Sequence, residues 1–165
     1  MVSVFNLRAC RPGHNLRPVR VIALSLRTSA LAKWYLNEFF SADVERYLME
    51  HGPVAISDLT VVEMRSLLAR RRREKHVDPK LENRVFSTFE DDIRRGFLIR
   101  HPMPATTAAG AVNLISTLPD VPLRTLDAMH LVIAREIDAS ILATADRIIA
   151  AGAHEMGISV VRFFR

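Results

Sequence analysis

Short apolar segments alternate with segments of helical periodicity along most of the chain, and no other feature constrains the fold as strongly. Their length suits buried strands rather than helices. We expect strands at Val21–Leu26, Val54–Ser57, Phe97–Arg100, Ala139–Ala143 and Ile158–Phe163. We expect helices at Ser29–Asn37, Ala42–Glu50, Leu59–Arg73, Pro79–Arg95, Ala105–Leu118, Arg124–Ile137 and Asp146–Ala151. This alternation predicts an α/β fold in which helices cover both faces of a central parallel sheet.

The end of the first expected strand is the most informative point of the sequence. Val21–Leu26 is followed at once by Arg27, and Thr28 or Ser29 is then expected to cap the next helix. In open α/β sheets the functional crevice lies at the carboxyl ends of the strands. We therefore expect residue 27 in the middle of any functional site.

Length and composition predict one globular domain preceded by a basic arm. The chain has 165 residues, of which 49% are hydrophobic, and this is enough for a sizeable core. Residues 1–20 contain four arginines and no acidic residue, so we interpret them as a loose arm and residues 21–165 as the folded domain. No apolar run approaches the roughly 20 residues that span a bilayer, and the arm does not resemble a secretory signal. The single cysteine, Cys10, excludes an internal disulfide and is typical of a cytoplasmic protein.

Three acidic residues occupy positions where a carboxylate is chemically informative. Glu63 lies in the helix after the second strand, Asp127 in the first turn of a later helix, and Asp146 directly after the fourth strand. A doubly wound sheet brings such positions to one crevice. Carboxylates that converge repel one another and favour a hard cation such as Mg²⁺ or Mn²⁺. This arrangement suits metal-assisted hydrolysis of a phosphodiester.

Each of these acids also has a structural interpretation. Thr60 and Glu63 have the spacing of a capping box, in which the glutamate only accepts a hydrogen bond from a backbone N–H. Asp127 and Asp146 are both favourable near helix N-termini because of the helix dipole. Taken singly, each acid fits the structural interpretation better. The occurrence of all three in one α/β framework favours the functional one.

Four segments follow one another along the chain: TSALAKWYLNE, SDLTVVEMRSLLARRRRE, LRTLDAMHLVIA and ILATADRII. In this order they resemble a PIN domain, and most closely the VapC-type toxins of bacterial toxin–antitoxin pairs. The resemblance extends over about Val21–Phe164. It implies an α/β/α sandwich with a central parallel sheet, Mg²⁺-dependent endoribonuclease activity, a homodimer and a cognate antitoxin. Glu63, Asp127 and Asp146 match the acidic positions of the family. Thr28 and Thr144 match hydroxyl positions beside them.

The sequence departs from the family pattern at the first acidic position. The family has an aspartate directly after the first strand, and this chain has Arg27. A guanidinium 4 Å from a carboxylate gains about 4 kcal/mol of raw attraction at an effective dielectric near 20, which desolvation partly offsets. We hypothesise that Arg27 fills the metal position and weakens or abolishes activity. The alternative is that Arg27 turns to solvent and that the remaining acids still hold one ion.

The net charge of +5 leaves two interpretations open, a polyanionic partner or ordinary solubility. The densest basic run, Arg70, Arg71, Arg72 and Arg73, is a candidate for contact with an RNA backbone. The commoner role of such a run is a solvated helix end.

Two other signals have structural and functional interpretations. Trp34 and Tyr35 fit packing beneath the first helix better than an interface. His130, three residues after Asp127, is more often a packed or surface residue than a general base.

The sequence therefore predicts a VapC-like ribonuclease weakened by Arg27. The main alternative is a degenerate, non-catalytic PIN domain that binds antitoxin or RNA. A DNA-directed nuclease of the same fold is the third.

Overall fold

A computed structural model describes residues 22–23, 29–36 and 38–164 of the chain. These residues form a five-stranded sheet in the order β3-β2-β1-β4-β5, and every adjacent pair is parallel. The strands are β1 (Ile22–Ala23), β2 (Val54–Ser57), β3 (Leu98–His101), β4 (Ile141–Thr144) and β5 (Ser159–Arg162). The predicted parallel α/β sheet is confirmed. Residues 1–21, which hold the expected basic arm, lie outside the described residues, so the arm remains a prediction.

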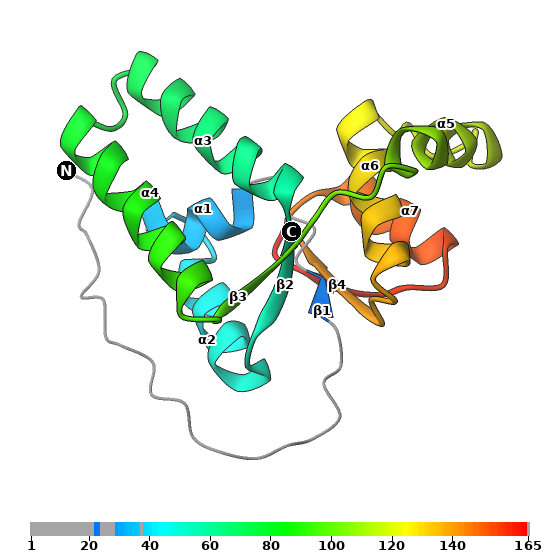
Figure 1. The fold of residues 1–165 in the computed structure, drawn as a ribbon, viewed down its shortest axis with the longest axis horizontal. Coiled ribbons are helices and arrows are strands. Elements are labelled where there is room, and N and C mark those ends of the chain that lie inside the picture. The colour runs from blue at the N-terminus through cyan, green and yellow to red at the C-terminus, as the bar shows by residue number, and fades with distance from the viewer. Residues whose placement is uncertain (1–21, 24–28, 37, 165) are drawn as a thin grey trace.

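Helices cover both faces of this sheet. They are α1 (Ser29–Leu36), α2 (Ser41–His51), α3 (Asp58–Arg73), α4 (Pro79–Arg94), α5 (Thr107–Thr117), α6 (Thr125–Glu136) and α7 (Arg147–Glu155). Figure 1 shows α1 to α4 on one side of the sheet and α5 to α7 on the other. None of the described helices is both long and apolar enough to cross a membrane.

Two hydrophobic clusters hold the three layers together. The α1–α4 side contains Leu48 and Phe89, and the α5–α7 side contains Leu131, all with no exposed surface. Consecutive residues of a strand point to opposite faces, and β4 contributes Leu142 to the second cluster and Ala143 to the first. The sheet is therefore buried on both faces, as an all-parallel sheet requires.

Most predicted boundaries lie within two residues of the observed ones, with one clear exception. The last helix was predicted to end at Ala151, and α7 instead continues to Glu155. Gly152 lies inside this helix and is buried, and a Cβ there would lie 2.5 Å from the Cδ1 atom of Leu131. The glycine permits close packing of α7 on α6 and does not end the helix. Of the first expected strand, Val21 and residues 24–26 lie outside the described residues.

One apolar residue of α3 lies outside the buried face of the helix. Val62 is 66% exposed, whereas Thr60, Met64 and Leu68 are fully buried. The buried residues of α3 recur every four positions, starting from Thr60, which is the spacing of one face of a helix. Val62 lies off that face.

Trp34 and Tyr35 pack beneath α1, as the structural interpretation predicts. The ring of Trp34 lies 5.6 Å from that of Phe97, and the ring of Tyr35 lies 5.9 Å from that of Phe89, between ring centroids. The Tyr35 hydroxyl donates to Asp92 Oδ2 of α4 at 2.5 Å. Burial raises the pKa of Asp92 above its ordinary value of 3.8, although the hydrogen bond from Tyr35 opposes this shift.

The raised pKa of Asp92 predicts that its ionisation destabilises the folded protein. A carboxyl with a higher pKa in the folded state favours folding below the unfolded pKa, and this advantage is lost as pH rises through the folded pKa. Asp92→Asn keeps an acceptor for Tyr35 but does not ionise. We expect urea unfolding to show the variant gaining stability relative to the wild type from about pH 3 to pH 7. A stability difference that is independent of pH would contradict this assignment.

Candidate functional site

The carboxyl ends of β2 and β4 lead directly into the helices that carry two of the predicted site residues. β2 ends at Ser57, which caps α3, and Glu63 lies in the second turn of that helix. β4 ends at Thr144, and Asp146 caps α7 two residues later. Because β1 pairs in parallel with both strands, these ends lie at the same edge of the sheet.

Glu63 has a different role from the predicted capping box. The box is formed by Ser57 and Thr60, since the amide of Thr60 donates to Ser57 Oγ and the amide of Ser57 donates to Thr60 Oγ1. The prediction that Thr60 and Glu63 form the box was therefore wrong. The helix begins two residues before Thr60, which moves the capping positions back along the chain.

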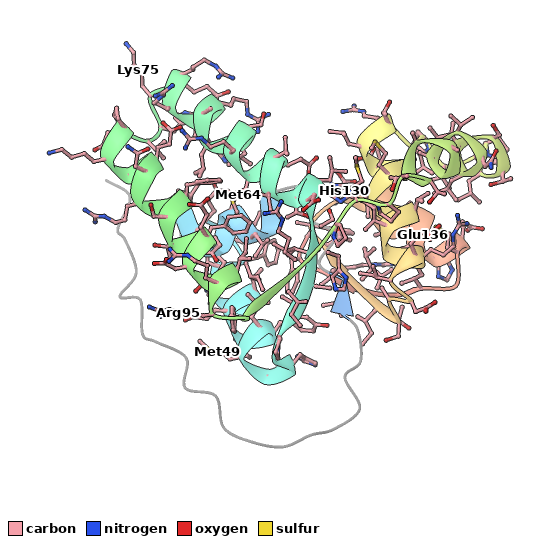
Figure 2. The ribbon with its side chains drawn as sticks, viewed as in Figure 1. Met49, Met64, Lys75, Arg95, His130 and Glu136 are labelled. Carbon is pink, nitrogen blue, oxygen red and sulfur yellow. The ribbon has the colours of Figure 1, made fainter. Side chains whose placement is uncertain are left out.

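The carboxylate of Glu63 instead contacts His130 of α6. His130 Nε2 lies 2.8 Å from Glu63 Oε2, and the side chains are 2% and 12% exposed respectively. An ionised carboxylate only accepts hydrogen bonds, so Nε2 is the donor. Figure 2 shows His130 beside the first turns of α3. The contact joins helices that belong to opposite faces of the sheet, and His130 lies one helical turn after Asp127 in α6.

Asp127 and Asp146 both accept backbone hydrogen bonds at helix starts. Asp127 is 1% exposed, and its Oδ2 atom accepts from the amide of Arg124 at 3.0 Å. Asp146 Oδ1 accepts from the amide of Ile148 at 2.8 Å and from that of Ile149 at 3.3 Å. Each carboxylate therefore stabilises a helix start, the structural role that its sequence position predicts.

Of the two predicted hydroxyls, the structure describes Thr144. Its side chain is fully buried, and Oγ1 accepts from the amide of Asp146 at 3.0 Å. Thr144 thus fixes the backbone that carries Asp146. Thr28 and Arg27 both lie outside the described residues, and their predicted roles remain predictions.

The donors that the structure describes do not by themselves fit the predicted metal site. Across residues 22–23, 29–36 and 38–164, no three side chains of His, Cys, Asp or Glu lie close enough together to hold a metal ion. The acidic position that the family places after β1 is occupied by Arg27 in this sequence. Glu63, Asp127 and Asp146 would therefore have to bind a metal without a close three-ligand group.

Comparison with known proteins identifies the family. The sequence profile of the PIN domain matches residues 26–155, which is most of the chain. The chain belongs to the PIN-domain family.

Two solved structures have folds similar to that of this chain. A chain from the structure of FitAB bound to an IR36 DNA fragment has a TM-score of 0.60 and 21% sequence identity, and the match covers 86% of this chain and 95% of that one. A chain from the crystal structure of FitAcB of Neisseria gonorrhoeae has a TM-score of 0.59 and 18% identity, with 86% and 98% covered. At these identities the similarity establishes the fold. No curated protein is similar enough to this chain to be matched.

Three of the four arginines predicted to touch RNA have acidic neighbours in this PIN domain. Arg71 Nη2 lies 2.6 Å from Glu38 Oε1. Arg72 Nε lies 3.1 Å from Glu82 Oε2. Arg70 Nε is 4.0 Å from Glu74 Oε1, in a pair where both side chains are largely exposed. The basic run therefore serves the packing of α3 at two of its positions.

His130 is the residue whose contact the sequence did not predict. Its spacing from Asp127 placed both on one side of α6, and the structural interpretation favoured a packed histidine. The histidine is indeed buried. Its pairing with Glu63, 67 positions earlier, depends on two helices meeting across the sheet, and no local pattern encodes that meeting.

A double-mutant cycle tests the contact between α3 and α6. We expect Glu63→Ala and His130→Ala to show a coupling free energy of about 1 to 2 kcal/mol in urea unfolding, because a hydrogen bond to a charged, mostly buried group is lost in each variant. The pair Arg46→Ala and Asp43→Ala, an exposed ion pair of α2, is the control and should couple by less than about 0.5 kcal/mol. A coupling near zero for Glu63 and His130 would contradict the contact.

The two roles of Asp146 can be separated by substitution. Asp146→Ala removes the cap of α7 and is expected to destabilise the protein by about 1 kcal/mol. Asp146→Asn keeps the accepting oxygen, and asparagine caps helices as well as aspartate does, so its stability should lie within a few tenths of a kcal/mol of the wild type. Thermal and urea unfolding measure both variants. Equal losses would show that the charge of Asp146, and not its hydrogen bonds, stabilises α7.

Proposed function

We propose that this PIN domain is a VapC-type endoribonuclease toxin of a toxin–antitoxin pair, which acts in the cytoplasm and whose Mg²⁺-dependent activity is weakened by Arg27. The contact of His130 with Glu63 carries this proposal, because it holds the acid of α3 against α6, the helix that also carries Asp127. PIN domains are typically nucleases, and the parallel sheet is the framework in which such an edge forms the functional crevice.

The weakening follows from charge. Arg27 stands in the sequence between β1 and α1, where the family pattern places its first carboxylate. A permanent cation there removes one ligand, repels a divalent ion and attracts the remaining carboxylates. Asp127 and Asp146 are the proposed metal ligands, and Glu63 is proposed to help hold the metal or to orient water. Since the described donors do not form a close three-ligand group, we propose weak binding of the ion.

A second candidate is a non-catalytic PIN domain that binds its antitoxin or RNA. A specific observation favours it: all three acids accept hydrogen bonds from protein groups, Glu63 from His130, Asp127 from Arg124 and Asp146 from Ile148. Such a site is stable without a metal ion. In either case we propose that the chain forms a homodimer and pairs with a cognate antitoxin, as VapC-type proteins do.

RNA cleavage by matched variants tests the proposal. We expect the wild type to cleave RNA slowly in Mg²⁺ and not at all in EDTA. We expect Arg27→Asp to cleave at least about tenfold faster, which corresponds to an activation free energy lower by about 1.4 kcal/mol. Asp127→Asn in the Arg27→Asp background keeps an acceptor for the amide of Arg124 and should abolish cleavage without unfolding α6.

Two outcomes would overturn parts of the proposal. If Arg27→Asp cleaves no RNA in Mg²⁺, the proposed ribonuclease activity is wrong, and the non-catalytic PIN domain is the remaining candidate. If wild type and Arg27→Asp cleave at the same rate, Arg27 does not weaken the site. Preference for single-stranded or structured DNA over RNA would assign the same chemistry to a DNA-directed nuclease.

A further inference from the structure

One helical hairpin carries a net charge as large as that of the whole chain. Residues 65–84, the outer part of α3, the connection and the first turns of α4, contain eight basic and three acidic residues. The remaining 15 basic and 15 acidic residues of the chain cancel one another. We call residues 65–84 the basic hairpin. Its charge equals the whole net charge of +5.

Some cations of the hairpin form ion pairs with glutamates, and the others are exposed to solvent. Glu82 is buried, with 1% of its surface exposed, and lies 3.3 Å from Arg65 and 3.1 Å from Arg72. Arg71 pairs with Glu38. These three arginines hold α3 against its neighbours. The displayed cations are Arg70, Arg73, Lys75, Lys80 and Arg84.

The acids of the hairpin do not neutralise the displayed cations. Asp78 Oδ1 accepts from the amide of Leu81 and caps α4, and Glu82 is enclosed. The ion pair of Arg70 with Glu74 is exposed on both sides, and such pairs contribute little. Within the described part of the chain, Arg73, Lys75, Lys80 and Arg84 have no carboxylate within ion-pair distance. Figure 2 shows Lys75 projecting from the end of the hairpin, and Figure 1 shows this end far from α5 to α7.

The hairpin is continuous with the candidate site. Arg70 follows Glu63 by seven residues, two helical turns, so both lie on one face of α3, about 10 Å apart along its axis. Arg73 lies about one turn beyond Arg70, at the end of the helix. A polyanion that follows this face passes from the basic end of the hairpin towards Glu63.

We infer that the basic hairpin binds the phosphate backbone of single-stranded RNA and guides it along α3 towards Glu63. This inference rests on the proposed action on RNA. Lysine and arginine side chains that neutralise phosphates release condensed counterions, which makes the binding steeply dependent on salt but independent of sequence. The hairpin provides affinity, and it is distinct from the acids at the sheet edge.

Two triple variants with the same loss of charge test the inference. Arg73→Gln/Lys75→Gln/Lys80→Gln removes three cations from the hairpin, and Arg46→Gln/Arg135→Gln/Arg162→Gln removes three exposed arginines from α2, α6 and β5. Binding of a fluorescent single-stranded RNA is measured by anisotropy in EDTA, which prevents metal-dependent cleavage, between about 50 and 200 mM salt. Circular dichroism confirms that both variants are folded.

We expect only the hairpin variant to bind RNA at least about tenfold more weakly than the wild type. Its plot of log K against log salt concentration should also be less steep by about 2, because each lost phosphate contact on a single strand lowers the slope by about 0.7. Equal binding by the two variants, or equal loss in both, would overturn the inference. So would a hairpin variant that binds RNA normally and loses only an acidic protein partner.

The outcome separates this inference from the proposed function. If the protein and its Arg27→Asp variant cleave no RNA, while the hairpin variant still binds RNA more weakly than its control, the ribonuclease fails and the hairpin inference stands. If RNA is cleaved but both triple variants bind it equally, the ribonuclease stands and the hairpin inference fails.

Discussion

Parallel pairing of β1 with both β2 and β4 is the constraint on which the site depends. It places the carboxyl ends of strands that are far apart in the sequence at a single edge. α3 begins directly after β2, and α7 begins two residues after β4. The sheet therefore positions the starts of the helices that carry Glu63 and Asp146. The helix α6, which packs on the opposite face from α3, carries His130 to Glu63. The hydrogen bond between His130 and Glu63 then ties the two faces together.

The sequence predicted the fold well because its elements are encoded locally. Short apolar segments gave the strands, and helical periodicity gave the helices between them. The clearest error arose where a tertiary contact decides: α7 continues through Gly152, where the glycine allows close packing on α6.

The contacts of the three predicted site acids were not predictable from local spacing. Local spacing suggested a cap for Glu63, and the cap was formed by Ser57 and Thr60 instead. The partner of Glu63 is distant in sequence, as is Glu38, the partner of Arg71 in the basic run. Arg72 of the same run pairs with the buried Glu82 of α4. Contacts of this kind depend on the packing of whole helices, so periodicity and spacing do not reveal them.

The structural roles of the acids bear directly on function. Asp146 caps α7 and Asp127 accepts the amide before α6, so both stabilise helices whether or not a metal ion binds. The acids alone therefore do not distinguish an active PIN domain from an inactive one. We propose that Arg27 distinguishes them, because a permanent cation stands in the sequence where the family has its first carboxylate.

Calorimetric titration of Mg²⁺ into the wild type and into Arg27→Asp tests the central claim most directly, since it needs neither RNA nor antitoxin. The account predicts weak or no binding by the wild type, and binding by the variant that is tighter by at least about tenfold, or about 1.4 kcal/mol. Tight binding of the ion by the wild type, unchanged in Arg27→Asp, would contradict it.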